Sequence, residues 1–330
     1  MTIGHVAGAG LGLRYELWDD LLECELEHTP IKFLELAPEN WMGMGGRRAE
    51  VFDQLAARFP LVAHGLSLSL GGPAPLDKAF LANVRTFLDD YQIELYTEHL
   101  SYCADTIGHW YDLLPIPMTL HTARYVADRI KEVQDSLGRQ IAIENASSYI
   151  VPEGSNLPEW EFVSEITEWA DCGIHLDINN VYVNSVNHHF DPYAYLAAID
   201  SSRVRYMHLA GHLEEEDPID ASRLLIDTHG RPVCEPVWEL FEAAIKRFGA
   251  VPTLLERDFN VPPFAELEAE VARITAIQNA VLQATSINLN EHDFLMQERA
   301  GVSKGLGRPS VSRTSKTTRL GVGADRGEVR

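Results

Sequence analysis

Imidazole and carboxylate side chains recur along this chain at the points where short apolar runs end. Several carboxylates gathered in one small volume would not stay ionised together without a compensating cation. The pattern therefore predicts a metal centre built from these motifs: Ala63-His64-Gly65, Glu98-His99, Glu144-Asn145, Asp177-Ile178-Asn179-Asn180, His208-Leu209-Ala210-Gly211-His212, Asp227-Thr228-His229 and Glu256-Arg257-Asp258.

The donor types narrow the choice of metal. Imidazole and carboxylate without thiolate suit iron, manganese or zinc, and disfavour a cysteine-based structural zinc site. A carboxylate has two oxygens that can reach different ions, so Glu144 and Glu256 are candidates to bridge two metals. The number of donors favours more than one ion, but spacing leaves open two or three ions and their redox activity.

Other polar residues give weaker signals. Glu39 is either a base that supports the site or a solvated loop residue, and His188-His189 is as typical of a surface loop as of a ligand pair. His175 lies two positions before Asp177, so on a strand it would share the same face. We assign these remaining histidines to structural or surface positions: His5, His28, His109, His121 and His175.

The apolar runs that precede these motifs are short and rich in β-branched residues, which is typical of buried strands. Each run ends in polar residues or glycine. We predict eight strands: Val6–Leu13, Ile31–Leu36, Leu61–Leu66, Ile93–Tyr96, Ile141–Ile143, Gly173–Ile178, Val204–Leu209 and Thr253–Leu255.

Amphipathic stretches of helical length separate the strands. The alternation predicts parallel strands with helical crossovers, and eight such units favour a closed (β/α)8 TIM barrel, an α/β fold whose functional residues lie at the carboxyl ends of the strands. An open doubly wound sheet would need a phosphate-binding loop, and Gly8–Gly12 resembles GxGxxG only loosely. The predicted helices are Tyr15–Glu27, Arg47–Phe59, Asp77–Asp90, Thr119–Leu137, Glu159–Ala170, Glu235–Phe248 and Phe264–Ala280.

Composition excludes several classes of protein. The chain has 330 residues and a formal charge of −22, a sign that repels nucleic-acid phosphates, so no nucleic-acid partner is expected. There is no signal-peptide pattern at the start and no apolar run of spanning length, which predicts a cytoplasmic protein without a membrane partner. The four cysteines form no CxxC pair and are expected to be buried free thiols.

The pattern of alternating elements fades near Ser286. We predict a metal-binding catalytic barrel domain over residues 1–285 and a C-terminal extension over 286–330. Residues 301–330 are rich in Gly, Ser, Thr, Arg and Lys, with seven basic and two acidic side chains, and are expected to form a disordered basic tail.

Taken together, the motifs resemble those of the multinuclear non-heme iron-dependent oxidative enzymes, the family that includes the methanobactin and bufferin biosynthesis oxygenases. The resemblance covers roughly residues 5–280. It rests on the strand-end motifs above together with Gly10-Leu11-Gly12-Leu13-Arg14, Glu35-Leu36-Ala37-Pro38-Glu39-Asn40 and His64-Gly65-Leu66-Ser67-Leu68-Ser69, Glu98-His99-Leu100-Ser101 and Asp227-Thr228-His229-Gly230.

The order of the motifs is also similar to that of the more distant endonuclease IV and xylose isomerase barrels. This resemblance implies that Asn180 stands where the endonuclease has a histidine, a departure from zinc nuclease chemistry. It further implies a ligand set of His64, His99, Glu144, Asp177, His208, Asp227, His229 and Glu256.

The resemblance also suggests catalytic residues and a reaction. Candidates near the metals are His212, Asn180 and Asp258, and His212 could replace His208 as the ligand from its strand, although we favour His208. The implied cofactor is two or three iron ions, suspected to be mixed-valent Fe(II)/Fe(III). The implied reaction is oxidation of a peptidyl residue, often cysteine, by dioxygen, with a small partner protein that presents the ribosomally made precursor peptide.

Two alternatives stay open at this point. One is a zinc- or manganese-dependent hydrolase or isomerase on the same residues, in which a metal-bound water does the work. The other is a non-catalytic protein that keeps the barrel and binds a peptide or metal. Dioxygen consumption separates the hydrolase or isomerase from the oxidative enzyme. Loss of activity after replacement of a candidate ligand separates either enzyme from a non-catalytic binding protein.

Overall fold

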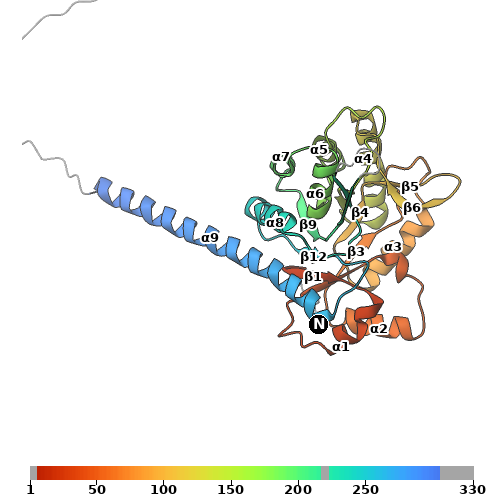
Figure 1. Cartoon of the computed structure of the whole chain (residues 1–330), viewed down its shortest axis with the longest axis horizontal. Helices are drawn as coiled ribbons and strands as arrows, with labels where there is room; N and C mark the ends of the chain where they lie inside the picture. Colours follow the sequence, from red (N-terminus) through yellow and green to blue (C-terminus); the bar gives the residue numbers. More distant parts are fainter. Residues whose placement is uncertain (1–5, 217–222, 305–330) are drawn as a thin grey trace, which may run out of the picture. The chain divides into compact units, whose positions relative to one another are not determined.

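Eight short parallel strands close into a barrel in the computed structural model, which describes residues 6–216 and 223–304 (Figure 1). Their order around the barrel is β1-β12-β9-β8-β7-β4-β3-β2. All eight predicted strands are present, with β4 beginning at the residue where its prediction ended. They are β1 Ala9–Gly12, β2 Phe33–Leu36, β3 Leu61–Gly65, β4 Tyr96–His99, β7 Ala142–Glu144, β8 Gly173–Asp177, β9 Val204–Leu209 and β12 Thr253–Leu255.

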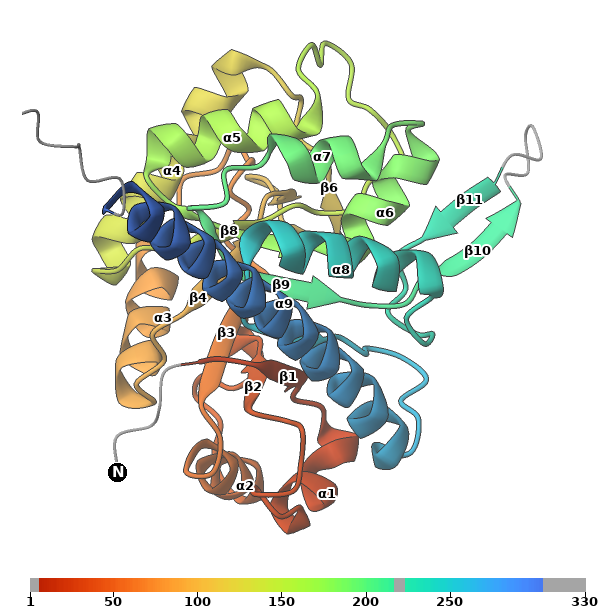
Figure 2. The ribbon, with the colours of Figure 1, turned by 90° about the vertical axis from the view of Figure 1, so that its left-hand side faces the viewer.

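Helices connect and cover the strands (Figure 2). The seven predicted helical stretches are all helical, although the first contains only a single 3-10 turn, η1 Tyr15–Leu17, and a short α-helix. The helices are α1 Trp18–Glu23, α2 Arg47–Ala56, α3 Lys78–Asp90, α4 Leu120–Leu137, α5 Glu159–Ala170, α6 Ile178–Asn187, α7 Pro192–Ala198, α8 Glu235–Phe248 and α9 Phe264–Lys304.

Helix α4 shows why these sequences form helices against the barrel. Thr119 caps its first turn by accepting a hydrogen bond from the Thr122 amide, and Gly138 ends it in the left-handed conformation that glycine adopts without strain. One face is apolar at a spacing of three and four residues, and that face is buried against the strands. Its buried residues are Ala123, Val126, Ala127, Ile130, Val133 and Leu137.

Several elements interrupt the simple alternation, and the sequence pattern did not predict them. The hairpins β5 Tyr102–Ala104 with β6 His109–Leu114, and β10 Leu213–Glu216 with β11 Arg223–Ile226, follow β4 and β9, and helix α6 begins directly after β8. A single 3-10 turn, η2 Pro38–Asn40, follows β2. All of these lie after carboxyl ends of barrel strands, where the site is expected.

The register of the strands sets polar residues side by side at that end. His99 of β4, Glu144 of β7 and His175 of β8 are in register, and Asp177 of β8 is in register with His208 of β9. Partners in parallel strands point to the same face of the sheet. The carboxyl end of the barrel interior is therefore lined by imidazole and carboxylate groups above an apolar body.

The chain divides into two units, Met1–Gln283 and Ala284–Arg330. Helix α9 is longer than the predicted Phe264–Ala280 and continues to Lys304. The predicted basic tail lies, from residue 305 onward, outside the described residues. All four cysteines are free; Cys103 and Cys172 are buried, as predicted, whereas Cys24 and Cys234 are only partly buried. No helix within residues 6–216 and 223–304 has both the length and the apolar character that crossing a membrane requires.

Candidate metal centre

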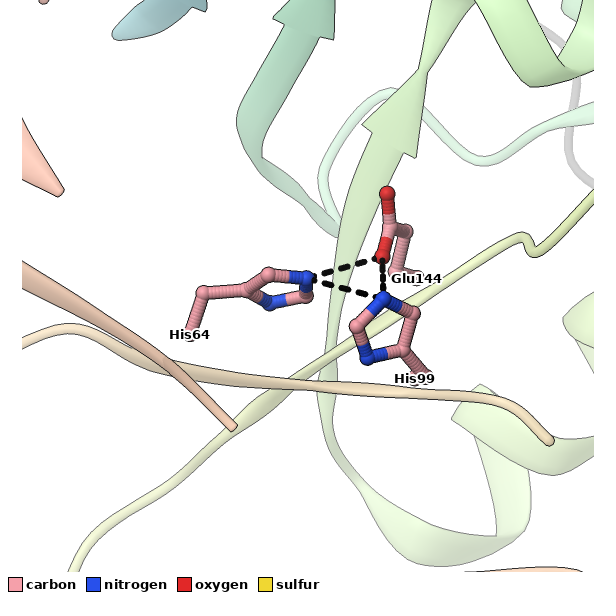
Figure 3. A group of neighbouring side chains, drawn as sticks. All are labelled: His64, His99 and Glu144. Atoms are coloured by element: carbon pink, nitrogen blue, oxygen red, sulfur yellow. Dashed lines mark hydrogen bonds and ion pairs between the residues drawn. The ribbon is translucent and has the colours of Figure 1, made fainter. Parts of the chain in front are cut away.

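Three side chains from neighbouring strands point at a common position inside the barrel (Figure 3). The Nε2 atoms of His64 and His99 are 3.2 Å apart, and Glu144 Oε2 lies 3.0 Å and 3.2 Å from them. Two ligands that each lie about 2.1 Å from one ion, at about 90° to each other, are about 3.0 Å apart. The spacing of these three atoms therefore fits ligands on one face of a single ion.

The hydrogen bonds behind this group orient its rings. His99 Nδ1 lies 2.9 Å from the carbonyl oxygen of Gly65, which can only accept a hydrogen bond. The proton of a neutral His99 is therefore on Nδ1, and the lone pair on Nε2 faces the other two groups. His64 Nδ1 lies 2.6 Å from Thr97 Oγ1, a hydroxyl that can donate or accept, so this contact fixes the orientation of the ring but not its tautomer.

His208 is fully buried among the imidazole and carboxylate groups at the carboxyl end of the barrel interior, which we call the polar layer. Its Nε2 lies 2.8 Å from Glu35 Oε2, and its Nδ1 lies 3.0 Å from Glu256 Oε2. Longer contacts of 3.7 Å and 3.9 Å link Nδ1 to Glu144 and Asp177. Glu35, His208 and Glu256 thus form a second group that could hold an ion.

A third group lies where β8, β12 and the loop after β11 meet. It consists of Asp177, His229 and Glu256, so Glu256 belongs to two groups. Asp177 caps helix α6 by accepting a hydrogen bond on Oδ1 from the Asn180 amide at 2.6 Å. Its other oxygen, Oδ2, is buried without a hydrogen bond among the described residues and faces the site.

His175 completes a fourth group with Glu144 and His208. It is fully buried, and neither ring nitrogen has a hydrogen-bond partner among the described residues. A buried imidazole without partners is costly unless something absent from the protein side chains binds it. Glu144 Oε2 and His208 Nδ1 also lack hydrogen bonds of normal geometry in this part of the chain. These atoms supply the donors that metal ions would need.

The pKa of each buried group in the polar layer depends strongly on the charges of its neighbours. Burial lowers the pKa of His64, but the carboxylates of Glu144 and, to a smaller extent, Glu35 together raise that pKa to about 9. Burial similarly opposes protonation of His208, yet Glu35 and Glu256 raise its pKa well above the usual value. Burial raises the pKa of Asp177, and the negative charges of Glu144 and Asp227 add to this effect. Protons on the histidines and divalent ions would therefore compete for the same carboxylates.

The structure brings together seven of the eight residues predicted as ligands, all except Asp227, within these groups. Asp227 lies beside them: its Oδ1 is 2.7 Å from His229 Nε2 and accepts a hydrogen bond of 2.8 Å from the Asn179 side chain. Between the two histidines after β9, His208 is inside the cluster, whereas His212 is not in any of the groups. This placement favours His208 as the ligand.

The three residues predicted to be catalytic lie around the cluster. His212 is half-buried and its Nδ1 contacts the Asn179 side-chain oxygen at 2.8 Å. Asn180 donates from Nδ2 to the Asn145 carbonyl, while its Oδ1 is buried without a partner among the described residues. Asp258 accepts a hydrogen bond from Arg14 and contacts His229 Nδ1 at 3.1 Å, so it orients that ring.

Two residues of the groups, Glu35 and His175, were not predicted as ligands. The prediction for His175 as a structural residue conflicts with its place in the cluster, and its position two residues before Asp177 was the signal for it. Glu35 is buried in the middle of β2 between Leu34 and Leu36. A glutamate within an apolar strand is rare unless it is paired, and this was the available signal.

Glu39 lies at the edge rather than in the cluster. Its Oε1 accepts a hydrogen bond of 2.8 Å from the Leu66 amide. The negative charge of Glu39 also acts on Glu98: burial first, and then Glu39, raises the pKa of Glu98 to about 8. Glu39 therefore holds the turn after β3 close to the end of β2, and it is neither fully solvated nor in any of the candidate metal groups.

A cavity of about 370 Å³ leads to the cluster from the surface. Glu35, His64 and Glu256 form its inner wall. Its outer wall carries Arg14 and the aromatic rings of Tyr15 and Trp41. The centroids of these two rings are 5.6 Å apart. A side chain that enters this cavity would meet the candidate metal groups directly.

Fold and site together define a class: a TIM barrel whose carboxyl end holds a buried cluster of histidine and carboxylate side chains. The barrel resembles solved structures that share little of its sequence. A xylose isomerase-like TIM barrel protein from Mycobacterium smegmatis, in complex with magnesium, superposes with a TM-score of 0.54 at 11% identity, over 86% of this chain and 100% of the other. A xylose isomerase domain protein from Planctomyces limnophilus gives a TM-score of 0.51 at 12% identity, over 86% and 100% of the two chains.

Sequence comparison identifies the family. Residues 8–279 match the family described as RiPP precursor modification enzyme MbnB/TglH/ChrH, and the chain belongs to this family. A UPF0276 protein of Acinetobacter baylyi is 50% identical over 274 residues, which cover 83% of this chain and 92% of the relative. A UPF0276 protein of Pasteurella multocida is 49% identical over 301 residues, which cover 85% and 97%. The family is one of enzymes, which argues against the non-catalytic alternative.

Proposed function

We propose that this protein is a multinuclear iron-dependent enzyme that uses dioxygen to oxidise a peptidyl cysteine of a ribosomally made precursor peptide. The observation that carries the proposal is the convergence of His64, His99 and Glu144 on one position. Two histidines and one carboxylate with open positions beside them are typical of non-heme iron oxygenases. Membership of a family of RiPP precursor modification enzymes supports the peptide substrate.

The sharing of residues between groups supports more than one ion. Glu144, His208 and Glu256 each belong to two of the four groups, so ions placed in neighbouring groups would have bridging ligands. We propose two or three iron ions on this layer. Bound iron would supply the redox chemistry that dioxygen requires and the Lewis acidity that favours a thiolate over a thiol.

The side chains around the cluster would bind and orient the substrate. Tyr15 and Trp41 give the cavity an apolar outer wall that excludes water around a peptide side chain. Asp258 holds Arg14 on one side and His229 on the other, so the entrance and the cluster are mechanically linked. His212, whose Nδ1 lies 2.8 Å from the Asn179 side-chain oxygen and whose Nε2 lies 4.0 Å from Cys234 Sγ, would exchange protons near the substrate.

The test is dioxygen uptake by anaerobically purified protein loaded with ferrous iron. Addition of a cysteine peptide followed by dioxygen should consume dioxygen in proportion to modified peptide, and Glu144→Gln protein should not. Stoichiometric turnover without dioxygen would contradict the proposal. The same donors suit zinc or manganese, so that result would favour a hydrolase or isomerase.

The small partner protein that presents the peptide is part of the proposal on the strength of the family resemblance alone. It predicts that dioxygen uptake with peptide rises when the partner is added to the purified enzyme.

A further inference from the structure

A second and larger cavity lies beside segments that carry candidate metal ligands. Its volume is about 650 Å³, and it is bounded by the loop after β11, the turn after β12, and helices α8 and α9, which lie on the same side of the barrel (Figure 2). Gly230, which follows His229, and Arg257, which follows Glu256, both line it. The segments that carry two candidate ligands therefore also form a wall of this cavity.

Arg257 is the buried polar group of the cavity. Only 4% of the residue is exposed, and its Nη2 donates to Glu270 Oε2 at 3.0 Å. Its Nε is buried without a partner among the described residues. The other oxygen of Glu270 already accepts from the Val233 amide at 2.8 Å. A guanidinium has five N–H donors in a fork, so Arg257 keeps donors for an acceptor that the surrounding side chains do not supply.

Two more arginines line the same cavity and differ in their availability. Arg273 is occupied, because it donates to both carboxylate oxygens of Glu235 at 2.6 Å and 2.8 Å and stacks over Trp238 at 4.4 Å. Arg231 is exposed and makes no hydrogen bond or ion pair with any described residue. Arg231 and Arg257 both line the cavity and keep N–H donors without a partner among the described residues. Glu266 and Glu270 line it as well, and both oxygens of Glu270 already accept hydrogen bonds.

Residues of one turn after β12 line both cavities. Asp258 lines the cavity that leads to the metal groups, and Asn260 lines the larger one. Phe259 lies between them in the chain and is 65% exposed. An exposed aromatic side chain at such a boundary gives a peptide backbone a surface to pack on.

We infer that the larger cavity is an anchor for a carboxylate side chain of the peptide whose cysteine enters the metal-side cavity. The inference rests on the proposed function for its peptide substrate. Arginine forks bind carboxylates through paired hydrogen bonds, which explains the free donors of Arg257 and Arg231. Because residues of the same turn line both cavities, the acidic residue and the cysteine would lie close together in the peptide sequence, and the separation is what the experiment measures.

The experiment measures binding of fluorescein-labelled Gly/Ser peptides to the full-length protein by fluorescence anisotropy. Each peptide carries one cysteine and one glutamate at a stepwise increasing separation on either side, and a matched set carries glutamine in place of glutamate. At the best separation the glutamate peptide should bind about tenfold more tightly than its glutamine twin, as expected for a charge-assisted pair.

Variants assign the preference to this cavity. Arg231→Glu should abolish or reverse the preference for glutamate, and Arg257→Lys, which keeps the charge but loses the fork, should weaken it. Arg124→Glu on α4 is the matched control, since Arg124 is exposed and stacks on Trp169 away from both cavities. Iron content of each variant is measured alongside, so that a disturbed metal centre is recognised.

The outcomes separate the two proposals. Equal binding of glutamate and glutamine peptides at every separation, or a glutamate preference that survives Arg231→Glu, would overturn the anchor and leave the cysteine-peptide proposal standing. Binding of neither peptide set would also overturn the anchor, whereas dioxygen uptake with the partner protein present tests the oxidative proposal separately. A preference for glutamate in protein that does not consume dioxygen would support the anchor and contradict the oxidative chemistry.

Discussion

The Nε2 atoms of His64 and His99 face each other at 3.2 Å, with the Glu144 carboxylate beside both. Because His99 holds its proton on Nδ1 against the Gly65 carbonyl, its Nε2 cannot also donate while the ring is neutral. Only a proton carried by His64 or a shared cation relieves the contact. Metal binding at this position is therefore expected to depend on the Glu144 charge and on pH.

Glu144→Gln should remove most of the bound metal, because the amide loses the charge that two groups of the cluster share. Glu159→Gln is a matched control: Glu159 is hydrogen-bonded by Tyr195 at 3.0 Å and Asn184 at 2.9 Å and lies outside the groups. Metal content by inductively coupled plasma mass spectrometry checks this. Full metal content in folded Glu144→Gln protein would refute the bridging role.

His208→Gln and His212→Gln should behave differently. His208 lies inside the cluster, so its loss should deplete metal, whereas His212 contacts Asn179 outside the groups and its loss should leave metal content near that of the wild type. Removal of a proton-transfer group typically lowers the rate about 10²–10⁴-fold, and we expect His212→Gln to fall in this range. Metal analysis and peptide turnover on the same preparations test the assignment of His208 as the ligand and His212 as the proton-transfer group. Loss of metal from His212→Gln protein, with metal retained in His208→Gln protein, would reverse it.

Metal uptake by the metal-free protein should strengthen as pH rises towards 9. Glu144 and, to a smaller extent, Glu35 raise the pKa of His64 to about 9 against the opposing effect of burial, so below that pH His64 carries a proton that a metal must displace. Each displaced proton gives up to about a tenfold change in apparent affinity per pH unit. Titration calorimetry in buffers of different ionisation enthalpy measures the released protons. Affinity that is flat between pH 6 and 9 would show that no proton is displaced.

Gly211→Ala should destabilise the protein by about 1–3 kcal/mol, the usual cost of an added methyl in a filled space. A Cβ at Gly211 would overlap the backbone carbonyls of Arg231 and Pro232, which belong to the loop that carries His229. Gly45→Ala is the control, since no atom lies within 4 Å of its added Cβ and its backbone is not in the left-handed region. Urea unfolding compares the two, and equal stabilities would show that the loop moves aside freely.

The barrel fold could be predicted from the sequence because apolar runs and amphipathic stretches alternate regularly. Parallel strands bring their carboxyl ends together, which is why the motifs at those ends were expected to meet. The positions of His64, His99 and Glu144 could also be predicted, because these residues stand at or near strand ends. Glu35 was not predicted as a ligand because it lies within β2 rather than after it. Only the closed barrel shows that its side chain reaches His208.

The loops were beyond the reach of pattern analysis. His229 adopts a positive φ of 50° and is placed by packing of its loop against Gly211 and by Asp258, contacts between segments distant in sequence. The hairpins β5–β6 and β10–β11 and helix α6 carry too short a periodic pattern to be distinguished from irregular chain. The larger cavity depends on these same long-range contacts.

The central claim is that the cluster holds iron, and metal analysis of anaerobically purified protein tests it most directly. Inductively coupled plasma mass spectrometry with Mössbauer spectroscopy should find two or more irons per chain, in both ferrous and ferric states after limited exposure to dioxygen. Zinc or manganese alone, in protein that ferrous iron cannot reconstitute to a dioxygen-reactive state, would contradict the account.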